Sequence, residues 1–194
     1  MANCGYMTIK GEKQGLISAG CSTPVSMGNK CRVMANCGYM TIKGEKQGLI
    51  SAGCSTPVSM GNKCQTGHSD EIMVLSFAHN MANIDNARHA THRPVFITKH
   101  VDKSSPLLSQ ALANRERVDC IINFYRTAAF GAQEKFYTVE IRGGLLTELT
   151  LDMPHVLMQG DAQPQEHVAI RYRDIIWTHH TAGTTGYASW SAES

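Results

Sequence analysis

The chain has 194 residues, of which 42% are hydrophobic, 7% aromatic and 18% charged, and its formal net charge is +2. This composition excludes a disordered tail and a fibrous repeat, and the short apolar stretches predict neither a membrane-spanning helix nor a signal peptide. No basic run with interleaved aromatic residues points to nucleic acid as a partner. We therefore expect a protein that is made in the cytoplasm and is not inserted in a membrane.

The beginning of the chain is an internal repeat, because residues 1–31 recur letter for letter as residues 34–64. Two identical copies are too few for a solenoid, which stacks about three or more repeats, so they indicate a recent duplication or an artefact. Only one copy can occupy a given place in a closed sheet. The second copy should take it, because that copy is continuous with the rest of the chain and closes a shorter loop. We predict an extra segment over residues 1–33, loosely held or paired at a sheet edge, and one domain over residues 34–194.

Alternation of apolar and polar residues at period two dominates the sequence from residue 34 onward. It predicts strands over residues 39–43, 71–79, 94–101, 118–127, 135–142, 144–152 and 166–178. Residues 55–62 are rich in turn-forming residues, and Gly143 with Gly144 predicts a turn or bulge between two of the strands.

One helix is predicted in the region Pro106 to Asn114. Ser105 suits the N-cap position and Pro106 the first helical position. The apolar residues that follow fall on one face of such a helix, namely Leu107, Leu108, Ala111 and Leu112. Several strands and a single helix predict a mainly β fold, an antiparallel β-barrel of two sheets with one α-helix.

A polar stretch over residues 79–93 has no strand pattern and predicts a long exposed loop. Connections in compact domains are usually about 4–6 residues long, and longer loops are often functional. We therefore expect this loop to have a role of its own.

Groupings of reactive side chains predict neither an enzyme nor a metal site. The nine histidines all follow residue 67, but only His89 with His92, and His179 with His180, are close in sequence. No zinc-binding spacing and no nucleophile-elbow motif occurs, and residues 67–71 are more simply a turn with polar caps. The spacing of the seven cysteines, three of them repeat copies, favours reduced and buried thiols over a disulfide framework. We predict no catalytic residue, no metal and no cofactor.

Six short segments in order suggest a family. They are GEKQG at 44–48, GHSDEI at 67–72, FITK at 96–99, DKSSPLL at 102–108, YRT at 125–127 and AGTTG at 182–186. With this order and spacing, residues 34–194 resemble the hemolysin-coregulated protein (Hcp) family, whose members are tube subunits of the bacterial type VI secretion system. Residues 1–33 have no counterpart in the family, which leaves their effect on assembly open.

The resemblance implies a structural protein that forms homohexameric rings, which stack into a hollow tube and carry and protect effectors. The implied partners are further copies of the chain, the VgrG spike, the contractile sheath and secreted effector proteins. The subunit would be secreted through the type VI apparatus directly from the cytoplasm. An alternative is a small secreted effector or adhesin-like β-barrel protein without tube assembly, although the chain leaves no room for an added catalytic domain.

The resemblance also implies positions for two contact surfaces. The loop over residues 79–93 would contact the neighbouring ring, with candidates His79, Asn83, Asn86, Arg88, His92 and Arg93. The helix would line or border the channel, and its candidates to face effectors are Ser109, Gln110 and Asn114.

Overall fold

The computed structural model describes residues 10–11, 15–16, 36–65, 67–83, 90–128, 131–159 and 162–190. The chain divides into two compact units, Met1–Lys30 and Cys31–Ser194. The first unit contains a short antiparallel pair, β1 (Lys10–Gly11) with β2 (Gly15–Leu16). Among the described residues, no helix is both long enough and apolar enough to cross a membrane.

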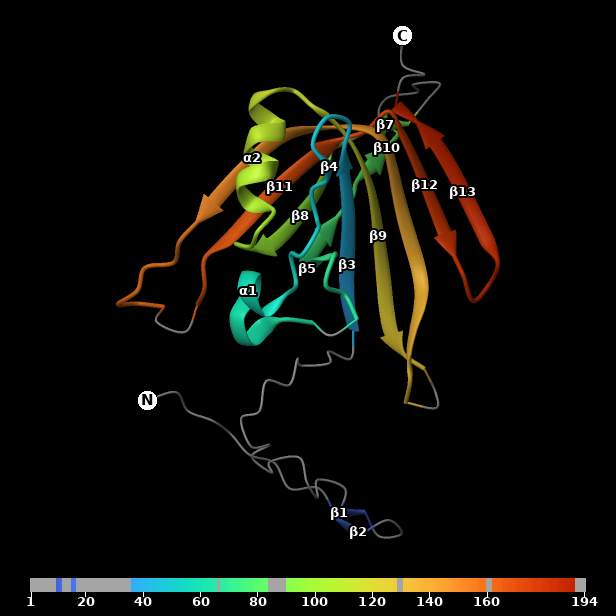
Figure 1. The fold of residues 1–194 in the computed structure, drawn as a ribbon. Helices are drawn as coiled ribbons and strands as arrows, with labels where there is room; N and C mark the ends of the chain where they lie inside the picture. The colour runs from blue at the N-terminus through green and yellow to red at the C-terminus, as the bar shows by residue number, and fades with distance from the viewer. Residues whose placement is uncertain are drawn as a thin grey trace. The chain divides into compact units, whose positions relative to one another are not determined.

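The second unit consists mainly of antiparallel strands (Figure 1). Its elements in chain order are β3 (Asn36–Gly44), β4 (Gly48–Leu49), α1 (Pro57–Met60), a 3-10 helix (Gly61–Lys63), β5 (Ile72–Ala78), β6 (Met81–Ala82), β7 (Thr91–His92), β8 (Val95–His100), α2 (Ser105–Ala113), β9 (Arg117–Thr127), β10 (Gln133–Asp152), β11 (Gln165–Arg171), β12 (Asp174–His179) and β13 (Thr184–Ser189).

The strands close into a barrel because β10 pairs with β11, the first strand of the order, as well as with β9. The pairing order is β11–β8–β5–β3–β9–β10, and β10 also pairs with β11. The first part of β10 lies between β9 and β12, and from Leu145 onward β10 pairs with β11. β13 pairs with β12 and extends the sheet beyond the barrel. The predicted antiparallel, mainly β barrel with a helix beside it is thus confirmed.

The second copy of the repeat supplies β3, which lies between β5 and β9. Its residues at alternate positions, such as Met40 and Ile42, are fully buried in the barrel. Opposite them, β9 buries Val118, Cys120 and Ile122 in the same way. This alternation is the pattern expected of strands with one face on a core.

Three details differ from the expectation. The turn-rich stretch contains the additional short helix α1, begun by Pro57 at a helix start. The two strands expected on either side of Gly143 are one strand, β10, since the glycines form a bulge within it: Gly143 has φ +57° and the pairing with β9 shifts between Ile141 and Gly144. The strand expected over residues 166–178 is divided into β11 and β12.

Candidate assembly surfaces

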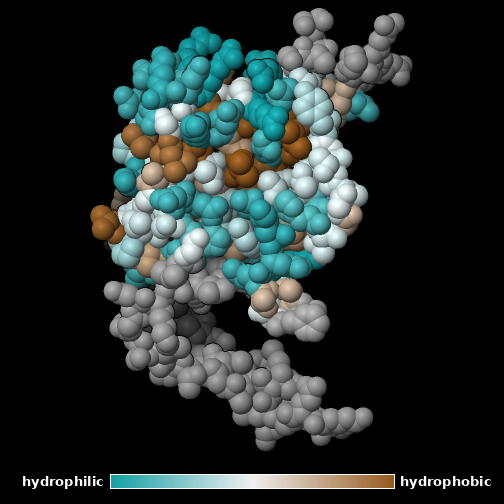
Figure 2. Space-filling view, turned by 45° about the vertical axis from the view of Figure 1, so that its right-hand side comes forward, coloured by the Kyte–Doolittle hydropathy of each residue, from teal (hydrophilic) through white to brown (hydrophobic). Residues whose placement is uncertain are grey.

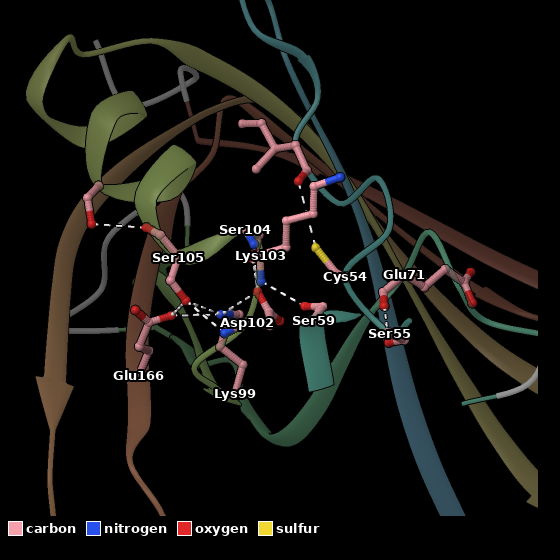
Figure 3. Close-up of polar contacts among 12 residues, drawn as sticks. Cys54, Ser55, Ser59, Glu71, Lys99, Asp102, Lys103, Ser104, Ser105 and Glu166 are labelled. Carbon is pink, nitrogen blue, oxygen red and sulfur yellow. Dashed lines mark hydrogen bonds and ion pairs between the residues drawn. The ribbon is translucent and has the colours of Figure 1, made fainter. Parts of the chain in front are cut away.

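Helix α2 is fastened to the barrel by a buried cluster of charged and polar groups (Figure 3). Lys99 on β8 is fully buried, and its Nζ lies 2.7 Å from Glu166 Oε2 on β11 and 3.1 Å from Asp102 Oδ1. The hydroxyl of Ser105 donates to the same Glu166 oxygen at 2.7 Å. The Lys99 ammonium group therefore faces two carboxylates at the beginning of α2, and each of the two carboxylates accepts further hydrogen bonds.

The cluster corrects the predicted helix start. The N-cap residue is Ser104, not Ser105, and its hydroxyl donates to Asp102 Oδ1 at 2.5 Å, with no side-chain bond to the helix. Ser105 is the first helical residue, and it receives the backbone N–H of Asp102 at 3.0 Å as well as bonding to Glu166. The Ser105 hydroxyl therefore connects α2 to β11.

Sequence analysis missed Lys99 and Glu166, although a signal for Lys99 was present. Val95, Ile97 and Lys99 are alternate residues of β8, and all three are buried. A lysine at an inward position of a strand needs a carboxylate partner, because an isolated buried charge is very unfavourable. Nothing in the local sequence identifies that partner as Glu166, which is 67 residues away.

The side of α2 away from the barrel carries the three residues predicted to face effectors. Leu108 and Ala111 are buried against the core, whereas Ser109, Gln110 and Asn114 are exposed. The Ser109 hydroxyl donates to the Ser105 carbonyl at 3.0 Å. Helix α2 thus packs one side against the core and presents a small polar face on the other side.

The GEKQG segment forms the turn between β3 and β4, and Glu116 holds it in place. Glu116 accepts the backbone N–H groups of Lys46 and Gln47 at 2.7 and 2.8 Å, and the Gln47 side-chain amide at 2.9 Å. These hydrogen bonds, led by those from Gln47, lower the pKa of the Glu116 carboxyl. The same Gln47 amide donates to the Leu107 carbonyl at 3.1 Å, which connects the turn to α2.

The base of the loop predicted to contact a neighbouring ring is tied to the barrel by two histidines. The hydroxyl of the buried Tyr172 lies 2.7 Å from His79 Nε2 and 2.8 Å from His92 Nδ1. It can donate to one imidazole and accept from the other. Trp190 stacks on His92, and Trp177 lies beside His79. Burial, with His92 nearby, lowers the pKa of His79.

The other predicted loop residues have different surroundings. Asn83 and Arg93 are exposed, and the Arg93 backbone N–H donates to the Asn80 carbonyl at 3.1 Å. β6 and β7 pair at the base of the loop, with Met81 opposite His92. Asn86 and Arg88 lie outside the described residues.

Several of the described histidine and cysteine side chains are held by contacts within the fold. His180 Nε2 lies 2.7 Å from the Thr138 hydroxyl, and His179 packs on Phe136 and Tyr137. Cys54 and Cys120 are fully buried, and burial raises the pKa of the Cys54 thiol to about 11. In the part of the chain that is described, no group of three or more His, Cys, Asp or Glu could hold a metal ion.

Comparison with known proteins places the chain in a family. The model of the family described as "Type VI secretion system effector, Hcp" matches residues 39–179. The chain is 40% identical over 199 residues to the Major exported protein of Pseudomonas aeruginosa strain PAO1, covering 98% of this chain and 96% of that protein. It is 35% identical over 184 residues to the uncharacterized protein YhhZ of Escherichia coli K12, covering 95% of this chain but 37% of YhhZ.

Solved structures agree with this assignment. A crystal structure of an Hcp protein superposes with a TM-score of 0.76 at 34% identity, covering 80% of this chain and 98% of that one. The secreted protein Hcp3 from Pseudomonas aeruginosa superposes with a TM-score of 0.72 at 41% identity, covering 80% of this chain and 99% of Hcp3. The similarity therefore extends over nearly all of both solved chains, and this chain belongs to the Hcp family of secreted type VI secretion proteins.

Proposed function

We propose that this chain is a structural subunit of the type VI secretion tube, and that six copies form a ring. Rings of this kind would stack into a hollow tube that carries and protects effectors, and would work with the VgrG spike and the contractile sheath. The observation that carries the proposal is the match over nearly the whole length of solved Hcp chains, together with a closed barrel. A closed barrel is rigid and can present fixed surfaces to its neighbours.

The exposed residues divide into two proposed contact surfaces. Ser109, Gln110 and Asn114 on α2 would face effectors in the channel, where weak polar contacts allow cargo to be released. Asn83 and Arg93, with the remaining residues of the 79–93 loop, would contact the next ring. His79 and His92 support this second role indirectly, because their bonds to Tyr172 hold the base of the loop.

The solution mass of the full chain tests the ring. Light scattering on a sizing column should give six times the mass of one chain. A monomer would overturn the ring proposal, and a small secreted effector or adhesin-like protein would then be the better interpretation.

Substitutions at Gln110 test the effector surface. Because this side chain is exposed, Gln110→Ala should change the binding of secreted effectors without changing the ring mass or the melting temperature. A Gln110 variant that loses the ring would contradict the assignment and would place this face of α2 between subunits.

A further inference from the structure

The repeat gives the chain two copies of a central barrel strand. Residues 3–11, in the first copy (residues 1–31), have the same sequence as β3 in the second copy (residues 34–64). β3 lies between β5 and β9 (Figure 1) and pairs with β9 along its whole length. Its Met40 and Ile42 are fully buried, while hydrophilic side chains predominate on the face of the molecule drawn in Figure 2. The first copy therefore has every side chain that this place in the barrel requires.

The identity extends beyond the strand. Ile50 and Cys54, which are fully buried after β3, recur in the first copy as Ile17 and Cys21. Apart from β1 and β2, the first copy lies outside the described residues. β1 and β2 pair in the same register as β3 and β4 do 33 residues later. The described part of the first copy thus repeats the local pairing of the second.

Replacing the second copy by the first requires only an inserted loop. Because the copies are identical, the chain can pass from one to the other at any residue of the repeat, which leaves 33 residues outside the barrel. Gly61 and Asn62 offer a suitable place, since both are exposed and a Cβ atom on Gly61 would meet nothing within 4 Å. A loop over residues 29–61 would enter the barrel there without displacing the core. The entropic cost of closing such a loop grows only slowly with its length.

The same reasoning explains why the second copy holds the place in the structure. With the second copy in the barrel, the first copy lies at the beginning of the chain and no additional loop is closed. One copy stays outside the barrel in either arrangement, so the two arrangements differ mainly in that loop. Damage to the second copy alone should reverse the preference when it costs more than closing the loop. A buried and unpaired carboxylate is among the most unfavourable changes in a core.

We propose that the first copy is a replacement for the second. When the second copy cannot fill its place between β5 and β9, the first copy fills it in the barrel of the same chain. The covalent connection favours this over replacement from another chain, because it gives the first copy a high effective concentration at its own barrel. The inference does not depend on the proposed function, since it concerns the folding of one chain.

A charge at Met40 tests the replacement in the full chain. Met40→Asp should keep a cooperative thermal transition in circular dichroism, at a lower melting temperature than the wild type because the loop must be closed. Met7→Asp is the matched control, since it makes the same change in the same local sequence, and it should keep the wild-type melting temperature. The double variant should lose the cooperative transition, because neither copy then has an intact strand. Loss of the transition in Met40→Asp alone would overturn the proposal.

A disulfide identifies the copy that is in the barrel. Thr41 lies opposite Ile121 of β9, and the corresponding residue of the first copy is Thr8. In the Met40→Asp chain, Thr8→Cys with Ile121→Cys should form a disulfide within one chain under oxidation, which peptide mass mapping identifies. Without Met40→Asp the same pair should form none, and Thr41→Cys with Ile121→Cys should form one.

The disulfide decides between the possible explanations of a folded Met40→Asp chain. A cooperative transition without a link between positions 8 and 121 would overturn the proposal, because the barrel would then tolerate the charge. A link that joins two chains would overturn replacement within the same barrel and place the first copy in the barrel of another chain. A wild-type chain that is monomeric would overturn the proposed ring and leave this inference unchanged.

Discussion

Lys99 is fully buried, which is rare for a lysine side chain. Its ammonium group is fully buried between Glu166 and Asp102. Removing one partner of a buried ion pair leaves uncompensated charge and costs about 3–5 kcal/mol. We expect Lys99→Met to lower the free energy of unfolding by about that amount in urea denaturation. The exposed neighbour gives a control, since Lys103→Met should change it by less than about 0.5 kcal/mol. Equal effects of the two substitutions would contradict the role of Lys99.

His79 should make stability depend on pH. Its lowered pKa means that the unfolded chain takes up a proton more readily than the folded one. The stability it contributes is therefore complete above the unfolded pKa of about 6.5 and is lost as the pH falls toward the folded pKa. Between about pH 7.5 and pH 5, the wild type should lose more stability than His79→Gln, as measured by urea denaturation. The exposed His155→Gln should follow the wild type, and identical curves for all three proteins would rule out a contribution from His79.

Among the elements, the β3–β4 hairpin shows most directly what the repeat does. β1 and β2 pair in the register Lys10 with Leu16 and Gly11 with Gly15, and β3 and β4 repeat it 33 residues later as Lys43 with Leu49 and Gly44 with Gly48. This short pairing thus follows from the repeated sequence itself. Strand β3 is longer than β1, and it also pairs with β5 and β9.

The two glycines of this repeat provide a matched pair of variants. A Cβ atom on Gly44 would collide with the Glu116 carboxylate that holds the turn. Gly44→Ala should therefore cost about 1–3 kcal/mol, as overpacking does, and lower the melting temperature. Gly11→Ala makes the same change in the same local sequence and should leave the melting temperature unchanged. If Gly11→Ala were the destabilising variant, the first copy would form the barrel strand.

At the scale of the whole molecule, residues 1–33 are proposed to be an addition that the barrel does not need. The barrel strand comes from the second copy, and the match to the family model begins at residue 39. Limited proteolysis should therefore cut within residues 1–33 before it cuts the barrel, and a chain that starts at Met34 should melt at the same temperature as the full chain. Equal resistance of the two parts to protease would contradict a loosely held segment.

Much of the fold could be predicted from the sequence, because the signals were local. Period-two alternation identified the strands that line the barrel, and helical spacing placed Leu108 toward the core. The errors arose where distant contacts decide the outcome. Gly143 and Gly144 predicted a turn or a bulge between two strands, and pairing on both sides makes them a bulge inside the single strand β10. Ser105 suited an N-cap, but its hydroxyl bonds to Glu166 on another strand.

The candidate surfaces were less predictable than the fold. His79 and His92 were selected as polar residues of a long loop, yet both side chains bond to Tyr172, which is 93 and 80 residues away. No local sequence pattern predicts a contact between residues so far apart in the chain. Sequence alone likewise does not show that the side chain of Leu157, in the connection after β10, is 92% exposed.

The continuity of β10 has a mechanical consequence. A force that pulls its two ends apart along the strand acts on the hydrogen bonds to β9, β11 and β12 in shear, so many bonds must break together. A hairpin pulled open from one end instead loses its bonds one after another. Because survival under load depends on the rate of unfolding and not on the equilibrium free energy, such a strand would slow the unfolding of a barrel that is pulled along β10.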